Sequence, residues 1–554
     1  MRFFTTHLVG ANWTDANQPS HGNTALKGTV YLDNQAIDAQ SFARHLERAN
    51  DAPSAMALLQ SLNGFYSWVE QTPTALRAGV DHIRSRPLFY GKKANHFYLS
   101  DDAVWVRQQV GEDEMDPVAR EEFLLTGYVT GSDTLFATIK QLQAGEYLLA
   151  TQSETGIKIS THRFYRFLHT EPTQFDEVKG FEALDQVALG SIQRLVDHAK
   201  GRQIVVPLSG GYDSRLIVTL LKRLNYQNIL TFTYGTPGNK ESKYSKHVAD
   251  ALGLRWHFVE YNAQLWREAW QTSERWDYQQ MAAGWSCLAH VQDWLAVKIM
   301  KNQGVLEKDC LFAPGHSGDF VAGSHIPDRA QKGITADFED MLESVFSVHY
   351  ALAPFHSTSS RPKKFWQARI LERTEATHVT DGVSLADAFE KWDWQERQAK
   401  FICNSVRVYE FFGYDWWLPL WDCEFMRFWE TIPLNLRKGR VWYLKYVSAQ
   451  FNGQSIKAIP NLGNAGDGSK YKQMARKVFK GNLFNLAKKV HATLPLLKVI
   501  KKTPLAEQSH YLLSGSDTQK VRKLEKENYS VVGAYALINS LELDKYLKRN
   551  DQNF

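Results

Sequence analysis

The sequence predicts two fold classes in one chain: an antiparallel-sheet N-terminal part of the α+β class, then a doubly wound parallel-sheet α/β part with a helical C-terminal part. Short apolar segments separated by polar turns fill the chain to about residue 165, as in antiparallel strands. From residue 204, apolar segments alternate with segments of helical periodicity, as in a parallel sheet covered by helices. We expect domains at 1–165, 175–465 and 466–554, and 554 residues allow several buried cores.

The antiparallel strands are predicted from period-2 alternation. Residues 62–69 alternate and include the turn signal Asn63-Gly64, and 76–80 and 96–100 read as further strands. Residues 81–91 are expected to form a turn that enters another strand.

The α/β part is predicted to begin with a helix over 175–198, followed by a buried strand at 204–208. The elements expected next are a helix with Leu216, Ile217, Leu220, Leu221 and Leu224 on one face, a strand at 229–235, a helix at 242–252 and a strand at 256–261. This alternation predicts a parallel sheet, whose ligands bind at the carboxyl ends of the strands.

A Ser-Gly-Gly turn follows the strand at 204–208. Gly210 and Gly211 let backbone N–H groups converge on an anion, and the following helix N-terminus adds its positive dipole end. Ser209 and Ser214 supply hydroxyl donors, while Asp213 is placed to hold Mg²⁺ against phosphates. The loop lacks the Gly-Lys-Ser/Thr of kinases and GTPases. We interpret it as a phosphate site; the alternative is a strand–turn–helix unit that only packs.

The pattern Ser-Gly-Gly-x-Asp-Ser resembles the pyrophosphate loop of the N-type ATP pyrophosphatases, and the chain to about residue 455 resembles the asparagine synthetase family. The resemblance implies a domain like the adenine nucleotide alpha hydrolases, which splits ATP between its α and β phosphates. It also implies that backbone around Pro207 and Tyr234 holds the adenine and ribose.

A second glycine-rich loop, at 311–323, resembles a further motif of this family. By this resemblance Gly315 contacts the nucleotide through its backbone, and Asp319 is the second Mg²⁺ carboxylate. The alternative is a glycine-rich loop with an exposed aspartate. His316 stands where the family has glutamate, which puts the aspartate-to-asparagine reaction in doubt. The histidine could pair with a substrate carboxylate, act as a base on an amine, or only pack.

The family also places a lysine near the transferring phosphate, where negative charge builds up. Lys445 is the residue we expect in this catalytic role, with Lys438 and Arg440 as rivals. The alternative for Lys445 is a solvated lysine on a surface helix.

The N-terminal part resembles the glutaminase domain of asparagine synthetases, an Ntn-hydrolase-like class II amidotransferase fold, through residues 62–69 and 81–91. The family uses a cysteine as the first residue of the mature chain. Here Met1 precedes Arg2, and no cysteine occurs before Cys287. Thr5 or Thr6 could replace it only after an unusual cleavage. We predict a retained domain without glutaminase activity.

The composition is that of a soluble globular protein, with 44% hydrophobic and 23% charged residues. A net charge of +5 is too small to imply nucleic acid, and we expect none. Four cysteines without metal-like spacing, and no long apolar segment or signal peptide, favour a cytoplasmic location. Residues 470–502 are basic and amphipathic. They could contact the inner face of a membrane, form a solvated rim, or bind RNA.

These features predict an ATP-dependent amide-forming ligase that adenylates a carboxylate and transfers it to ammonia or a substrate amine, with ATP and Mg²⁺ as cofactors. The substrate class is a small-molecule or sugar carboxylate, in surface-polysaccharide or specialised-metabolite synthesis, and a homodimer is compatible with the prediction. The alternatives are an ammonia-dependent asparagine synthetase, a nucleotide-binding protein without turnover, and a tRNA-modifying enzyme.

Overall fold

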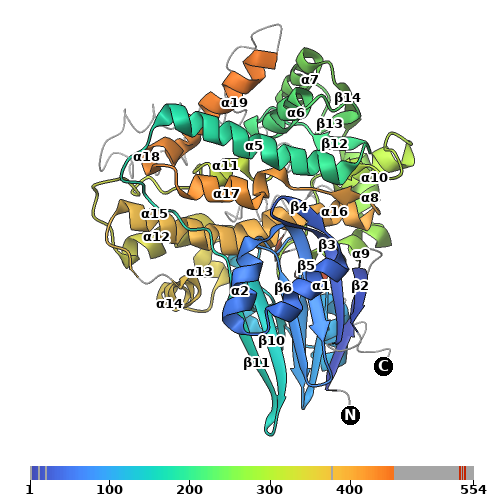
Figure 1. Cartoon of the computed structure of the whole chain (residues 1–554), viewed down its shortest axis with the longest axis vertical. Coiled ribbons are helices and arrows are strands. Elements are labelled where there is room, and N and C mark those ends of the chain that lie inside the picture. Colours follow the sequence, from blue (N-terminus) through green and yellow to red (C-terminus); the bar gives the residue numbers. More distant parts are fainter. Residues whose placement is uncertain are drawn as a thin grey trace.

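The computed structural model describes residues 3–9, 13–18, 22–375, 378–454, 536, 537, 540, 542 and 543. A sheet-rich N-terminal region, blue in Figure 1, lies against a larger α/β region that runs from green to orange. The two fold classes predicted from the sequence are both present.

The N-terminal region contains two sheets. One has seven strands in the order β11-β10-β6-β5-β3-β2, with β4 paired to β3, and all of its pairings are antiparallel. The other has the order β1-β8-β7-β9, in which β1 runs parallel to β8. The strands are β1 (Phe4–His7), β2 (Trp13–Gln18), β3 (Gly22–Leu32), β4 (Gln35–Ile37), β5 (Asn63–Gln71), β6 (Ala75–Val80), β7 (Phe89–Lys93), β8 (His96–Ser100), β9 (Ile139–Gln141), β10 (Glu146–Ser153) and β11 (Gly156–Arg163).

The two sheets pack face to face because their strands alternate apolar side chains with period 2. Leu76, Ala78 and Val80 of β6 share a core with Phe97 and Leu99 of β8. Helices α1 (Ala39–Arg48) and α2 (Ala52–Ser61) are associated with the larger sheet, and α3 (Ala103–Val110) packs on β7 and β8. Helix α4 (Pro117–Thr126) follows α3.

The α/β region is built on a parallel sheet of order β14-β13-β12-β15-β16. Its strands are β12 (Ile204–Pro207), β13 (Ile229–Gly235), β14 (Arg255–Glu260), β15 (Leu311–Phe312) and β16 (Asp415–Trp416). The chain winds from β12 outward to β14 and then returns to the other side of β12, so the strand order reverses between β12 and β15. Ligands of open α/β sheets bind at such a reversal.

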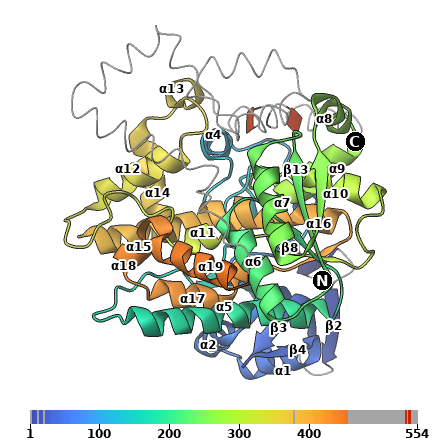
Figure 2. The same ribbon diagram turned by 90° about the horizontal axis from the view of Figure 1, so that it is seen from above.

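The helices of this region confirm the expected alternation. The predicted helices at 175–198 and 242–252 correspond to α5 (Glu177–Ala199) and α7 (Lys240–Leu252). Helix α6 (Tyr212–Arg223) packs against both α5 and α19 (Val441–Gln454), and Figure 2 shows the three together. The remaining helices are α8 (Ala263–Trp270), α9 (Ser273–Ala283), α10 (Trp294–Asn302), α11 (Gly318–Val321), α16 (Arg407–Phe411), η3 (Pro419–Trp421), α17 (Cys423–Glu430), α18 (Leu434–Arg437) and η4 (Lys438–Arg440).

A helical insertion between β15 and β16 has a core of its own, built around Trp366, Phe389 and Trp392 and joined by Leu125 of α4. Its elements are α12 (Phe338–His349), α13 (Phe355–Thr358), α14 (Lys363–Thr374), α15 (Gly382–Asp393), the π-helix η1 (Trp394–Ile402) and the 3₁₀ turn η2 (Cys403–Val406). The insertion returns the chain to the sheet edge through η1.

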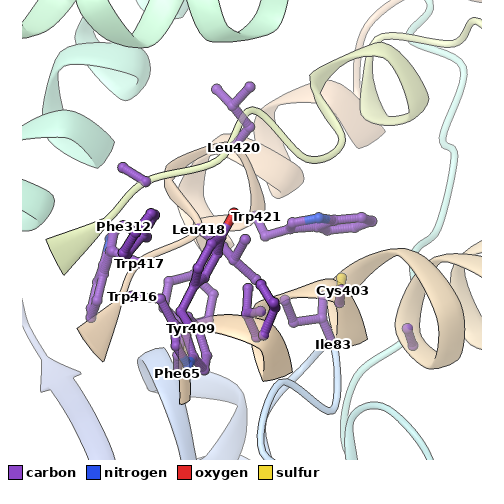
Figure 3. Close-up of a cluster of buried hydrophobic side chains, with 14 of the residues drawn as sticks. Phe65, Ile83, Phe312, Cys403, Tyr409, Trp416, Trp417, Leu418, Leu420 and Trp421 are labelled. Carbon is purple, nitrogen blue, oxygen red and sulfur yellow. The ribbon is translucent and has the colours of Figure 1, made fainter. Parts of the chain in front are cut away.

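The contact between the two regions is aromatic. Figure 3 shows Phe65 and Ile83 of the N-terminal region among Tyr409, Trp416 and Trp417 of the α/β region. The rings of Phe65 and Trp417 meet edge to face, with centroids 4.7 Å apart. All of these side chains are buried, so the two regions share one hydrophobic core.

Of the predicted extension at 466–554, only Ala536, Leu537, Ser540, Glu542 and Leu543 are described. Glu542 forms an ion pair with Arg275 of α9, 2.8 Å long. The basic segment 470–502 lies outside the described residues. None of the helices in the described parts of the chain has the length and hydropathy needed to cross a bilayer.

Candidate functional site

The first glycine loop lies between the end of β12 and the start of α6. Strand β12 is buried up to Val206, whereas Ser209 is exposed. Gly211 is the N-cap of α6 and provides no side-chain hydrogen bond to the first turn. The first N–H groups of α6 are therefore available to an anion, and the helix dipole favours negative charge there.

Serine hydroxyls fix the shape of this loop. The Ser209 backbone N–H donates to Ser214 Oγ at 3.2 Å, and the Gly211 N–H donates to Ser209 Oγ at 3.1 Å. Ser214 is buried and Gly210 packs against Tyr244. These contacts fix the shape of the loop, with the Ser209 and Gly211 N–H groups bonded to serine hydroxyls.

The second glycine loop, after β15, touches the first. A Cβ atom on Gly315 would lie 2.8 Å from the Ser214 backbone nitrogen, and one on Gly318 would lie 2.7 Å from the Tyr443 hydroxyl. Only glycine permits this approach, because a real Cβ atom does not come so close to backbone. The two loops therefore form a single site at the reversal of strand order.

The site brings Asp213 and Asp319 together. The Asp319 backbone N–H donates to Asp213 Oδ2 at 3.2 Å, and the Tyr443 hydroxyl donates to Asp213 Oδ1 at 2.8 Å. Burial, together with the charge of Asp319, raises the pKa of Asp213 to about 7. Two carboxylates that repel each other in a half-buried place are stabilised by a cation between them.

The donor set fits Mg²⁺ shared with a phosphate better than a metal held by protein alone. Among the residues that the structure describes, no group of three or more His, Cys, Asp or Glu side chains could hold a metal ion. Mg²⁺ is commonly bound by one or two carboxylates plus substrate phosphates. Asp213 and Asp319 supply two such carboxylates beside the first glycine loop, which we interpret as the phosphate site.

The structure places Lys445, the predicted catalytic cation, away from the Asp213 carboxyl group. Tyr443 of α19 reaches Asp213, and Lys445, two residues on, projects about 200° away around the helix and is exposed. Lys438 donates to backbone oxygens of Asp328 and Ala330. Of the two rivals, Arg440 lies where its positive charge opposes the rise in the pKa of Asp213 and of Tyr443.

His316 is half-buried in the second loop, with its ring centroid 6.1 Å from that of His290. Burial, and then the charge of His290, lower the pKa of His316 to about 4. The side chain is therefore neutral at physiological pH, which argues against the predicted alternative of pairing with a carboxylate as a cation. The role as a base stays a prediction.

Sequence reasoning did not single out the residues that support the second loop. His325 Nδ1 contacts Asp393 Oδ2 at 2.5 Å, and His325 Nε2 lies 3.7 Å from Asp319 Oδ2. Ser317 Oγ donates to Gln398 Oε1 at 2.8 Å. Asp393 and Gln398 lie at the end of α15 and in η1, far along the chain, so no local spacing could have indicated them.

The residues expected around the nucleotide lie at the ends of adjacent strands. Pro207 and Tyr234 are both half-buried. Pro207 is the last residue of β12 and Tyr234 the last but one of β13, and the two strands pair in parallel. Tyr234 stacks on Tyr261 with centroids 5.0 Å apart. The placement agrees with the expectation that backbone here holds adenine and ribose, which stays a prediction.

The N-terminal region presents no exposed thiol. All four cysteines, from Cys287 onward, are buried, and burial raises the pKa of Cys287 to about 11. Thr5 and Thr6 lie inside β1, paired with Tyr98 and Leu99 of β8. Thr5 and Thr6 are half-buried, and their hydroxyls bond to His96 and Gln71. The loss of glutaminase activity stays a prediction.

Two protein-family models match the chain. An asparagine synthase model matches residues 197–448, and a glutamine amidotransferase domain model matches residues 52–165. The first spans both glycine loops and Tyr443. Among curated proteins, no relative matches.

Solved structures resemble parts of the chain. The glutamine PRPP amidotransferase of B. subtilis is 12% identical, with 55% of this chain and 63% of that one covered and a TM-score of 0.20. The allosteric regulatory enzyme of purine biosynthesis is 13% identical, with 58% and 57% covered and a TM-score of 0.19. The NH3-dependent NAD synthetase of Campylobacter jejuni is 18% identical, with 27% and 60% covered and a TM-score of 0.19. The chain thus covers less than two thirds of each of these structures.

Proposed function

This chain belongs to the asparagine synthetase family, and we propose that it is an ATP-dependent carbon–nitrogen ligase that activates a carboxylate as an acyl-adenylate. The observation that carries the proposal is the contact of Asp213 with Asp319 across two glycine loops, beside the open N-terminus of α6. That arrangement suits the binding of a magnesium–pyrophosphate group at the end of a parallel sheet.

In the proposed first step, a carboxylate oxygen of the substrate attacks the α-phosphorus of ATP, and the bond from that phosphorus to the β-bridging oxygen breaks. Backbone N–H groups of Gly210 and Gly211, with the hydroxyls of Ser209 and Ser214, bind the pyrophosphate as it forms. Mg²⁺ held by Asp213 and Asp319 would neutralise phosphate charge. Arg440 offsets the charge that builds up on the α-phosphate.

In the second step the amine nitrogen attacks the acyl carbon, AMP leaves, and the nitrogen loses a proton. His316 is the proposed acceptor of this proton because its ring is neutral near pH 7. Its pKa of about 4 makes it a weaker base than an ordinary imidazole, since the best base has a pKa near the working pH. Its neutrality also sets the site apart from one with a glutamate, so an acceptor reaction other than ammonia-dependent asparagine synthesis is favoured.

The nitrogen is proposed to come from ammonia or from an amine on the substrate rather than from glutamine. The four buried thiols and the pairing of Thr5 and Thr6 within β1 support this proposal. The acid is a small-molecule or sugar carboxylate, as used in surface-polysaccharide or specialised-metabolite synthesis. Stoichiometric release of glutamate from glutamine during turnover would overturn the inactive-glutaminase proposal, and ammonium should replace glutamine wherever both are tested.

The deciding experiment is acid-dependent exchange of labelled pyrophosphate into ATP, over amino acids, uronic acids and small peptides, with Asp213→Ala as the inactive control. Exchange with one class of acid, together with AMP as product, supports the ligase. ADP as product would overturn adenylation. Tight ATP binding with no exchange and no AMP from any acid would favour a nucleotide-binding protein without turnover.

A further inference from the structure

Arg215 lies near the start of α6, directly behind the first glycine loop, and is only 5% exposed. Its guanidinium donates from one terminal nitrogen to the backbone oxygen of Gly210 at 3.3 Å, and its Nε has no hydrogen-bond partner. Within the part of the chain that the structure describes, no carboxylate pairs with it. Arg215 is therefore a buried cation without a counterion beside the proposed phosphate site.

Two aromatic rings hold this guanidinium in place. Its central carbon lies 4.8 Å from the ring centre of Tyr212 and 5.3 Å from that of Phe451 of α19. Both rings are buried. Contacts of a cation with aromatic rings offset part of the cost of burying the charge, but they do not replace the missing hydrogen bonds. Holding the charge behind the loop therefore costs the fold some stability.

Arg223, about two turns further along α6, shows how a structural arginine is bound on the same helix. It donates two hydrogen bonds to Asp185, at 2.6 and 2.9 Å, and a third to Gln450 at 2.6 Å. Such a bidentate pair with a carboxylate is the arrangement that suits a guanidinium best. Arg215 instead directs its hydrogen bond at the backbone of the loop, which indicates a role in shaping the loop.

The hydrogen bond from Arg215 fixes the orientation of one peptide group. In a trans peptide the C=O and the N–H point in opposite directions, so a Gly210 oxygen directed at Arg215 turns the Gly211 N–H to the other side. That N–H donates to Ser209 Oγ at 3.1 Å, and Ser209 is exposed. A peptide between two glycines turns over easily, because neither residue has a Cβ atom. The reversed peptide would present an acceptor to an anion in place of a donor.

We propose that Arg215 is a positioning residue of the first glycine loop, which keeps the Gly211 N–H directed at the pyrophosphate and places a positive charge behind it. This inference rests on the proposed function, which puts pyrophosphate in this loop. Arg215 acts through the Gly210 carbonyl and does not touch the phosphate. The bound anion supplies the negative charge that the fold leaves out.

The test is the binding of magnesium pyrophosphate to the full chain, measured by titration calorimetry for wild type, Arg215→Met, Arg215→Lys and the matched control Arg223→Met. Methionine keeps much of the packing but removes the charge and the donors. Arg215→Met should weaken binding about 10- to 100-fold. Its melting temperature without the anion should not fall, because an unpaired buried charge is removed. Arg215→Lys should bind between the two, and Arg223→Met should bind as wild type.

Gly211→Ala separates the orientation of the peptide from the effect of charge. Gly211 has φ of −75° and ψ of 173°, which alanine also adopts. Turning the peptide over would carry this φ to positive values, which alanine disfavours. In the Gly211→Ala background, Arg215→Met should therefore weaken binding by less than about threefold. An equal loss in both backgrounds would show that Arg215 acts by charge alone and would overturn the positioning role.

Equal affinities of wild type and Arg215→Met would overturn the inference and leave the proposed ligase standing, as would an equal loss with Arg223→Met. A wild type that does not bind pyrophosphate would overturn the inference and the proposed phosphate site together. Weaker binding by Arg215→Met, in a protein that supports pyrophosphate exchange with no acid, would support the positioning role although the proposed ligase fails.

Discussion

Buried charges have counterions at the contact between the two regions, whereas at the two glycine loops they do not. Beside the contact, Arg194 and Asp422 of the α/β region pair through two hydrogen bonds of 2.6 and 2.7 Å, and Asn34 and Asn63 of the N-terminal region bond to them. Across the contact, Lys400 donates to Glu396 and to the backbone of Val129 and Gly131. At the loops, Asp213 faces Asp319, a group of the same charge.

The difference separates structural charges from functional ones. A charge matched inside the fold stabilises one arrangement of the chain, and removing its partner leaves an uncompensated buried ion. A charge that the fold leaves unmatched costs stability until a ligand matches it, so such groups concentrate at functional sites. Mutations of paired charges at the contact should therefore lower the stability of the fold and leave turnover unchanged. Mutations of unpaired charges at the glycine loops should lower turnover and leave stability unchanged.

Asp213→Ala should have the largest effect. Loss of a carboxylate that faces the phosphates should reduce pyrophosphate exchange by about 10⁴-fold or more, equivalent to ~5 kcal/mol in the activation barrier. The melting temperature of the nucleotide-free protein should not fall, because a repelling charge is removed. Exchange within tenfold of wild type would remove Asp213 from the proposed metal site.

Arg194→Ala should show the reverse. It leaves Asp422 buried and unpaired, which should cost roughly 3–5 kcal/mol of unfolding free energy in urea. Turnover per folded molecule should stay near wild type. The control is Lys246→Ala, which breaks an exposed pair with Asp250 and should change stability by less than about 0.5 kcal/mol. Equal effects of the two variants would contradict the distinction between the contact and the surface.

Most of the framework could be predicted from local sequence pattern. Strands β6, β8, β13 and β14 and helix α5 appear where periodicity placed them, and the residues of both glycine loops come together as expected. These features depend on the alternation of side chains and on the positions of glycines, both of which can be recognised from a few consecutive residues.

The features that could not be predicted depend on contacts between residues that are far apart in the sequence. Strand β16 is a two-residue edge inside an aromatic segment, and it exists because it pairs with β15. Spacing alone could not show which face of α19 meets Asp213. Gly439 and Arg440 adopt positive φ angles of 70° and 61° just before the helix, and these angles set its register. His325 and Asp393 meet only through the helical insertion.

Arg440→Ala and Lys445→Ala compare two cations at the start of α19, one near Asp213 and one pointing away from it. Loss of the charge near Asp213 should lower kcat about 100-fold, or ~2.7 kcal/mol, with a small change in the KM for ATP. Lys445→Ala should retain wild-type kcat, since its side chain projects away from the site. The two variants are to be compared in the same pyrophosphate exchange assay. A larger loss with Lys445→Ala would support the catalytic role that the sequence analysis gave to Lys445.

The smallest expected effect is the contribution of Asp213 to the pH dependence of the unfolding free energy. The pKa of this carboxyl is raised by burial and by Asp319 to about 7 in the fold, from an ordinary value of about 4. The folded state therefore favours the protonated form. This contribution to stability is fully present below the ordinary pKa and is lost as pH rises through about 7.

Asp213→Asn removes that titration and imitates the protonated carboxyl. Without nucleotide and with EDTA, the excess in stability of the variant over wild type should be larger at pH 8 than at pH 5 by on the order of 1–2 kcal/mol, allowing for solvent screening of a half-buried group. Unfolding in urea at the two pH values measures the difference. Magnesium with a non-hydrolysable ATP analogue should close the gap at pH 8, because the bound cation stabilises the charged form of Asp213 in wild type alone. A constant difference at both pH values would show that the pKa of Asp213 is not raised in the fold. The carboxylate of Asp319 would then not repel that of Asp213, and the pair would not be an unmatched charge at the site.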